Sequence, residues 1–176
     1  MNSNYKVGLT WEEINSEDCR LFLSSPDAGA NVLFFGTTRA TSNPNGCCQF
    51  NEMNANKPNN HSHNDSEKLP VTHLSYSCHE RLAVKSMTTI AQQALQNPGV
   101  IKVLILHKLG EVPVGEISVV VGVSCAHRRE GWEVADWVLE EVKRKVEIWK
   151  KEVFENNQHV WKSNAKDDLL NLQRRE

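Results

Sequence analysis

The run from Glu116 to Ser124 constrains the fold most, because it is almost entirely apolar and rich in valine. It reads Glu-Ile-Ser-Val-Val-Val-Gly-Val-Ser, and β-branched residues in a short run of this kind predict a strand. Polar and apolar residues do not alternate along it, so both faces of the strand are expected to be covered. A chain of 176 residues is long enough to provide that cover within one domain.

The remaining patterns predict a fold of the α+β class, with a mostly antiparallel sheet and packed helices. About four or five strands and two substantial helices are expected, with some strands consecutive along the chain. Glycine and proline mark the segment from Lys108 to Gly115 as a connection. Further strands are predicted at residues 5–9, 31–36, 71–77 and 100–107, and helices at 19–23 and 79–96.

The stretch from Cys125 to Glu152 predicts an amphipathic helix that carries the candidate site. Apolar residues recur at offsets 0, 3, 4, 7, 11 and 14 from Ala135, which is one face of a helix. At about 100° per residue, Lys143 and Lys150 point within roughly 20° of each other on the flank of this face. A lysine placed there can bury its stem and present its ammonium at the edge of a pocket.

His127 and Arg128 stand where this helix is expected to begin, and free N–H groups at a helix start favour an anion. Together with the lysine pair they indicate a site for a phosphorylated or otherwise anionic small molecule. A second interpretation stands beside it. Acidic residues crowd the first turns and basic residues the last, which complements the helix dipole without any function.

Residues 40–69 differ in composition from the rest of residues 1–165, which are otherwise expected to form a single domain. Eight asparagines lie in this insertion with very few β-branched or aromatic residues, which predicts a mobile loop. The insertion contains four residues of types that bind metals: Cys47, Cys48, His61 and His63. The two cysteines are adjacent and the histidines are two apart, spacings that fit no usual zinc finger, so no metal is expected. Residues 166–176 are predicted to be a polar tail.

Composition and motifs exclude several classes of function. The formal net charge of −2 gives no basic field for nucleic acid or membrane surfaces. No secretory h-region and no membrane-length apolar stretch is visible, and the five cysteines lack framework spacing, so a cytoplasmic location is expected. Neither nucleotide-binding glycine fingerprint is present.

Cys125 is two residues from His127, but a buried structural thiol is favoured over a nucleophile. His107, at the end of an apolar strand, is interpreted as a satisfied histidine.

A set of separate segments resembles the large (catalytic) subunit of molybdopterin synthase, the MoaE family. The Ala-His-Arg and Ile-Trp-Lys-Lys-Glu elements, with a lysine seven residues upstream of the first lysine of the second element, are specific in combination. The resemblance covers roughly residues 5–162 and is interrupted by the insertion. The matching segments, in family order, are Gly29–Arg39, Leu74–Tyr76, His107–Glu116, Val119–Arg128, Val142–Lys143, Ile148–Glu152 and Val160–Trp161.

The resemblance implies a sulfurtransferase of molybdenum cofactor biosynthesis with an α/β-hammerhead type of fold. In the family, cyclic pyranopterin monophosphate (precursor Z) is converted into the dithiolene of molybdopterin. Sulfur arrives as a thiocarboxylate on the C-terminal glycine of a small ubiquitin-like subunit. The large subunit pairs with itself, which gives a heterotetramer. No cofactor is implied, and no catalytic cysteine is needed in this chain.

Carried over position by position, the resemblance assigns roles to seven residues. Lys143 matches the principal catalytic lysine and Lys150 the second one. Either ammonium could stabilise developing negative charge, or act as acid or base, and the sequence leaves both roles open. The residues expected to contact the substrate are Arg39, His127, Arg128, Lys143, Lys150, Lys151 and Glu152.

The chain also departs from the family pattern. Lys108 stands where the family usually has arginine, which removes a bidentate guanidinium. Ser77, Cys78 and His79 replace Glu-Ala-Tyr, Glu147 replaces proline, and Gly131-Trp132 replaces Ala-Phe. Two alternatives to an active enzyme follow: a catalytically impaired scaffold that keeps the small-subunit interface, and a non-enzymatic anion-binding module.

Overall fold

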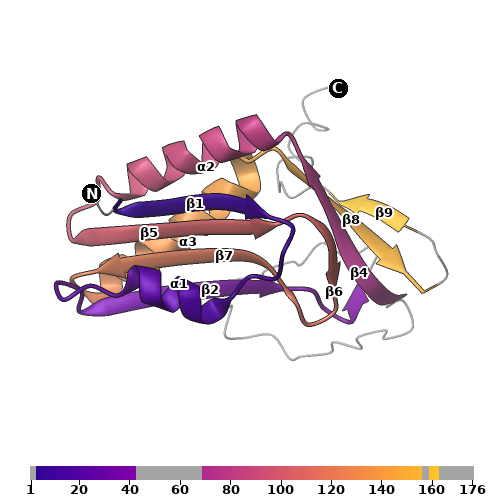
Figure 1. Cartoon of the computed structure of the whole chain (residues 1–176), viewed down its shortest axis with the longest axis horizontal. Helices are drawn as coiled ribbons and strands as arrows, with labels where there is room; N and C mark the ends of the chain where they lie inside the picture. Colours follow the sequence, from indigo (N-terminus) through magenta and orange to yellow (C-terminus); the bar gives the residue numbers. More distant parts are fainter. Residues whose placement is uncertain (1–2, 43–68, 156–158, 163–176) are drawn as a thin grey trace, which may run out of the picture.

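The computed structural model describes residues 3–42, 69–155 and 159–162 (Figure 1). The insertion and the polar tail, with the cysteines and histidines of the insertion, lie outside these residues, apart from the ends of the insertion. Within them the elements are β1 (Tyr5–Thr10), α1 (Ser16–Leu23), β2 (Ala30–Thr37), β3 (Thr41–Ser42), β4 (Leu69–Cys78), α2 (Glu80–Ala94), β5 (Val100–Lys108), β6 (Gly110–Pro113), β7 (Ile117–Cys125), α3 (Arg128–Lys145), β8 (Ile148–Phe154) and β9 (His159–Lys162).

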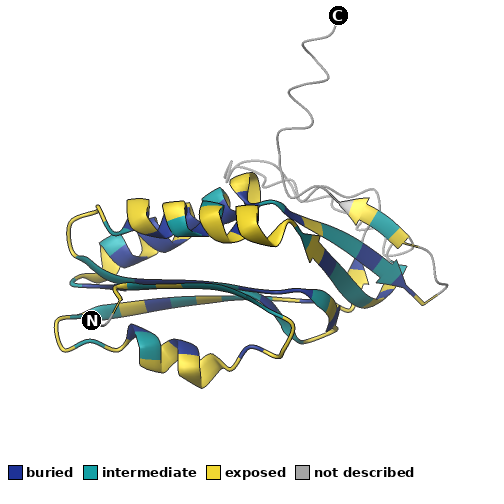
Figure 2. Ribbon diagram, turned by 45° about the horizontal axis from the view of Figure 1, so that its top comes forward, coloured by how far each residue is buried: buried dark blue, intermediate teal, exposed yellow. Residues whose placement is uncertain are grey.

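The first sheet has four strands in the order β1-β5-β7-β2, with β7 in an interior position. Strand β1 runs parallel to β5, while β5–β7 and β7–β2 are antiparallel. Figure 2 shows α2 and α3 on one side of this sheet and α1 on the other. The two faces of β7 therefore enter different cores. Val121 and Val123 pack in the cluster that includes α2 and α3, and Val120 packs with Leu23 of α1. The prediction of a strand covered on both faces is confirmed.

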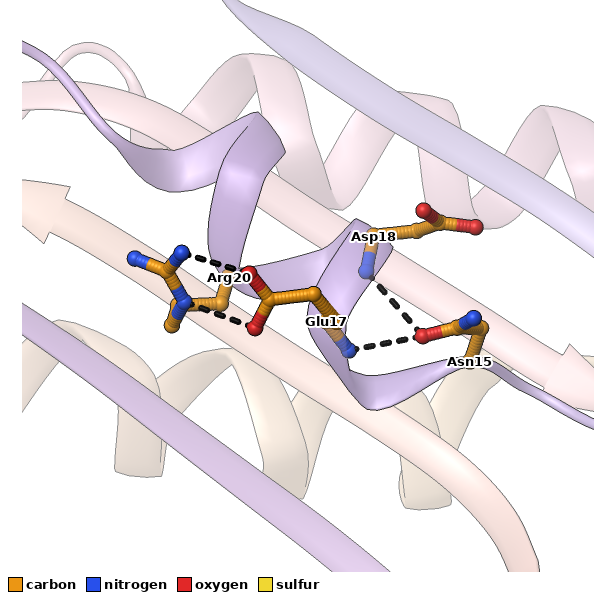
Figure 3. A network of polar contacts seen from close by, with 4 residues as sticks. All are labelled: Asn15, Glu17, Asp18 and Arg20. Carbon is orange, nitrogen blue, oxygen red and sulfur yellow. Dashed lines mark hydrogen bonds and ion pairs between the residues drawn. The ribbon is translucent and has the colours of Figure 1, made fainter.

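Helix α1 is short, and its start is defined by one side chain (Figure 3). Asn15 Oδ1 accepts hydrogen bonds from the backbone N–H groups of Glu17 (2.8 Å) and Asp18 (3.3 Å), which is an N-cap. Leu23, at the other end of α1, reaches Gly122 of β7 so closely that a Cβ at Gly122 would lie 2.6 Å from its Cδ1. Glycine at position 122 thus allows α1 to pack directly on the central strand.

The second sheet has the order β3-β4-β8-β9, and β6 also pairs with β4. All its pairings are antiparallel, and it lies beyond one end of the four-stranded sheet (Figure 1). The α+β class with mostly antiparallel sheets is confirmed. Among the described residues, no helix is both long and apolar enough to cross a membrane.

Two sequence predictions about this second sheet are wrong. Residues 110–113, expected in a connection, form β6. The helix expected to continue through Lys150 ends at Lys145, and residues 148–154 form β8 instead. The physical reason lies in which positions of β8 face inward. Lys150 and the buried Glu152 occupy inward positions, while Trp149 is 52% exposed, so the alternation typical of a strand is absent from the apolar residues.

Candidate functional site

A cavity of about 410 Å³ lies where the two sheets meet the C-terminal end of α3. This volume falls in the range of small-molecule sites. Part of its lining is apolar and comes from three strands, through side chains such as Leu74 of β4, Val119 of β7 and Ile148 of β8. The full set of lining residues is Phe34, Gly36, Thr37, Arg39, Thr41, Ser42, Val71, Leu74, Tyr76, His107, Ser118, Val119, Leu139, Val142, Lys143, Ile148, Lys150 and Glu152.

Three cationic side chains line this cavity, each from a different part of the fold: Arg39, Lys143 and Lys150. Arg39 follows the end of β2 and is exposed, and Lys143 stands in the last turn of α3. Lys150 lies on β8 opposite Tyr76 of β4. The two lysines therefore line one cavity although Lys143 stands on α3 and Lys150 on β8, and their expected placement on one helical face is wrong. Three positive charges around one hollow favour an anionic ligand.

Strand β8 separates its functional side chains by alternation. Lys150 and Glu152 line the cavity, whereas Lys151 does not. The Lys151 ammonium lies 5.9 Å from the centroid of the Trp161 ring on β9 instead. Lys151 is thus turned to the other face of the strand, as the two-residue period of a strand requires.

Glu152 places a buried carboxylate beside the three cations. Only 5% of it is exposed, and its Oε2 accepts a hydrogen bond of 2.6 Å from the Ser42 hydroxyl. Ser42 belongs to β3 and also lines the cavity. The cavity therefore combines a cationic set with a hydrogen-bonded anion, an arrangement that can hold both an anionic group and a donor group of one ligand.

His107 and Tyr76 are packed edge to face in the cavity wall, with ring centroids 4.7 Å apart. Burial lowers the pKa of His107 to about 4, so the imidazole is neutral at physiological pH. Its Nδ1 lies 2.8 Å from the Lys108 carbonyl oxygen, which can only accept, so Nδ1 carries the proton. Burial also raises the pKa of Tyr76. The sequence did not predict that these two rings line the cavity. His107 lies at the end of an apolar strand, a position that is also usual for a structural histidine.

His127 and Arg128 lie away from the cavity, at the opposite end of α3. His127 is the N-cap residue of α3 and Arg128 its first residue, and both side chains are exposed. At 1.5 Å of rise per residue, Arg128 and Lys143 are separated by roughly 22 Å along the helix axis. The expectation that five basic side chains converge is therefore corrected: one chain unites Arg39, Lys143 and Lys150 but not His127 and Arg128.

The alternative chemistries receive no support from the described residues. Burial raises the pKa of the Cys125 thiol, which donates a hydrogen bond of 2.9 Å to the His127 carbonyl oxygen rather than pairing with the imidazole. A thiol held in this way is a structural one. In residues 3–42, 69–155 and 159–162, no group of three or more histidines, cysteines and carboxylates is arranged to hold a metal ion.

Comparison with known proteins agrees with this geometry. The profile of a family described as MoaE protein matches residues 9–145. The molybdopterin synthase catalytic subunit of Aspergillus niger is 38% identical over 165 residues, which cover 94% of this chain and 78% of the relative. The protein of the same name from Emericella nidulans is 39% identical over 160 residues, which cover 91% of this chain and 70% of the relative.

Solved structures share the fold at lower identity. The crystal structure of molybdopterin synthase from Staphylococcus aureus superposes with a TM-score of 0.67 at 24% identity, covering 88% of this chain and 94% of that one. A complex of subunits 1 and 2 of the molybdopterin-converting factor from Helicobacter pylori superposes with a TM-score of 0.62 at 18% identity, covering 92% and 91%.

Proposed function

Because the chain belongs to the MoaE family, whose relatives at 38–39% identity are molybdopterin synthase catalytic subunits, we propose that it catalyses the same step. The reaction is sulfur transfer to cyclic pyranopterin monophosphate, which forms the dithiolene of molybdopterin. The observation that carries this proposal is one cavity lined both by Arg39, Lys143 and Lys150 and by apolar side chains. A flat heterocycle can contact the apolar side chains while its phosphate binds the cations.

In this proposal the sulfur comes from a partner protein, which is consistent with a cavity that has no cysteine among its described lining residues. Two thiocarboxylates, each at the C-terminal glycine of a small ubiquitin-like subunit, supply the two sulfur atoms of the dithiolene one after the other. Water cleaves the thioester formed in each transfer, so the sulfur stays on the pterin and the subunit leaves as its carboxylate. The ammonium groups of Lys143 and Lys150 then stabilise the negative charge that develops as the thiocarboxylate attacks and as the cyclic phosphate opens. Fixed charges in a partly enclosed cavity do this better than water, since they need no reorganisation.

A second copy of the chain is the simplest way to bring His127 and Arg128 to the same substrate. These two side chains are exposed and roughly 22 Å from Lys143 along α3, so they cannot reach a small molecule held by the same chain's lysines. In a two-fold dimer the start of α3 of one chain can lie at the cavity of its partner. Two such chains with two small subunits form the heterotetramer.

The decisive experiment is reconstitution with purified components. The chain, its thiocarboxylated small subunit and cyclic pyranopterin monophosphate are mixed, and molybdopterin is measured through its fluorescent oxidation products. Product formation that depends on the thiocarboxylate is expected. A chain that binds the small subunit and yields no product would be a scaffold, and one that binds phosphates or nucleotides but neither small subunit nor pterin would be a plain anion-binding module.

The dimer is tested by mixing two inactive chains. Lys143→Ala and Arg128→Ala chains are co-expressed with different tags, and mixed dimers are isolated through both tags. Each mixed dimer contains one intact site if the site is shared between copies, so it is expected to recover about half of the wild-type activity. Mixed dimers no more active than the parent variants would place the action of Arg128 elsewhere.

A further inference from the structure

Thr38 immediately precedes the cavity residue Arg39. Arg39 is exposed, but Thr38 is buried and hydrogen-bonded. Only 3% of Thr38 is exposed. Its N–H donates to the Glu116 carbonyl oxygen (3.1 Å), and its own carbonyl oxygen accepts from the Gly115 N–H (2.9 Å). Its hydroxyl donates to the Val112 carbonyl oxygen (3.1 Å). The backbone that leads into Arg39 is therefore tied to the segment between β6 and β7.

The segment between β6 and β7 is a tight turn with its own internal support. The Glu116 N–H donates to the Pro113 carbonyl oxygen (3.1 Å), and Gly115 has φ of +89°, a conformation that favours glycine. The tip of the turn is open to solvent, since Val114 is 42% exposed and a Cβ at Gly115 would meet no atom within 4 Å. It needs an anchor if it is to hold Thr38 in one place.

An ion pair supplies this anchor. The Lys108 ammonium at the end of β5 lies 2.5 Å from Glu116 Oε2, and the Lys108 side chain is only 10% exposed. A desolvated ammonium without its partner is costly, so the pair resists opening more than an exposed surface pair would. Lys108 does not itself line the cavity.

We propose that the Lys108–Glu116 pair is a positioning device for Arg39. The pair fixes the β6–β7 turn on the end of β5, and the turn fixes Thr38 through two backbone hydrogen bonds, while β6 adds the bond to its hydroxyl. Thr38 in turn sets where the Arg39 guanidinium meets the substrate. This inference rests on the proposed function in one respect, the role of Arg39 in holding the substrate phosphate. Lys108 touches no substrate atom and acts only through Arg39.

The first test does not depend on activity. Amide hydrogen exchange at Thr38 and Gly115 is measured by NMR in wild type, Lys108→Met and Lys108→Arg. Methionine keeps the length of the side chain without its charge, and exchange at both amides is expected to accelerate about tenfold. Arginine restores the ion pair, so exchange is expected to return to within about twofold of wild type. Glu116→Gln serves as a second variant that weakens the same link.

The matched control is Lys102→Met, which removes another partly buried ammonium from the same strand. Lys102 Nζ donates to the carbonyl oxygens of Phe22 (2.9 Å) and Ser24 (2.7 Å), at the end of α1. This change is expected to leave exchange at Thr38 and Gly115 unaltered. Equal acceleration in Lys102→Met and Lys108→Met would mean general destabilisation and would overturn the proposal, as would unchanged exchange in Lys108→Met.

The second test connects the pair to the substrate. In the reconstituted reaction, Lys108→Met is expected to raise KM for the pterin phosphate about tenfold and to change kcat less than about twofold, because ground-state binding is what Arg39 provides. In an Arg39→Ala background the same change is expected to have almost no further effect on KM. Additive effects would overturn the positioning role. A third outcome is faster exchange in Lys108→Met together with a wild-type KM in Arg39→Ala. That outcome would contradict the role of Arg39 in the proposed function, while the link from Lys108 to Thr38 would stand.

Discussion

Helix α3 carries basic groups at both ends, and the surroundings of the two ends differ. At the C-terminal end the chain continues into β8, and Lys143 lines one cavity together with Lys150 and the buried carboxylate of Glu152. At the N-terminal end His127 and Arg128 are exposed, with no cavity-lining residue next to them in the sequence. An anion in the cavity at the C-terminal end would meet three charges: Lys143 of α3, Lys150 of β8, and Arg39 between β2 and β3. An anion at the N-terminal end would meet two exposed side chains, whose charges are screened by salt unless another molecule covers them.

The largest expected effect concerns the C-terminal end. Lys143→Ala is expected to lower kcat by about 10²–10³-fold, because it removes a fixed charge from the reacting centre. Lys145→Ala is the matched control: it lies half a turn further on, pairs with Glu141 and does not line the cavity, so activity within about twofold of wild type is expected. Both are measured by product formation under single turnover. Similar losses in the two variants would remove the distinction between cavity lysines and helix-end lysines.

The next effect concerns His107, a buried residue in the lining of the cavity. His107 has a folded-state pKa of about 4 and an ordinary pKa near 6.5, so below pH 6.5 the unfolded chain binds a proton that the folded chain excludes. Stability is therefore expected to fall as the pH falls from 6.5 to 4, by on the order of 3 kcal/mol from this group. Urea unfolding of wild type and His107→Gln across this range measures it. Parallel pH profiles in the two proteins would show that His107 titrates equally in both states.

A smaller effect is expected at the N-terminal end, where Gly131 replaces the alanine usual in the family. A Cβ at Gly131 would lie 2.8 Å from Cys125 Sγ and 3.2 Å from Val32 Cγ2. Gly131→Ala is expected to cost about 1 kcal/mol, because overpacking exceeds the gain in helix propensity. In a Cys125→Ala background the cost is expected to shrink or reverse. An unchanged cost in that background would assign it to Val32 rather than to the thiol.

The smallest effect concerns the corner between α3 and β8. The Ser86 hydroxyl of α2 donates to the Glu147 carboxylate at 3.0 and 3.3 Å, where the family usually has proline. Glu147→Ala is expected to lower the free energy of unfolding by about 0.5–1 kcal/mol and to leave activity unaltered, since neither residue lines the cavity. Chemical denaturation of Glu147→Ala, Ser86→Ala and the double variant checks this. A double variant that loses the sum of both single effects would mean that the two groups are not coupled.

Most elements of the four-stranded sheet and its helices were predictable, because each buries a face that the sequence marks with apolar residues. The apolar run of β7 and the period of α2 are local signals of this kind, and the start of α1 is marked instead by its cap residue Asn15. Strand β8 was not predictable from periodicity, since its inward positions carry Lys150 and Glu152, and Val142, Val146 and Trp149 continue the helical spacing across the turn. The family resemblance still pointed to Arg39, Lys143 and Lys150, although the helical argument for the two lysines was wrong.

By itself, the sequence determined which side chains carry charge, which strands must be buried, and which family motifs are present, because these depend on residue type and short spacings. Tertiary structure alone decided which charges share a cavity. The change from helix to strand after Lys145 places Lys150 opposite Tyr76 and Lys151 near Trp161, and the full length of α3 keeps Arg128 away from Lys143. The physical reason is that the positions of charges within a site are set by strand register and helix length, which depend on contacts between residues distant in the chain.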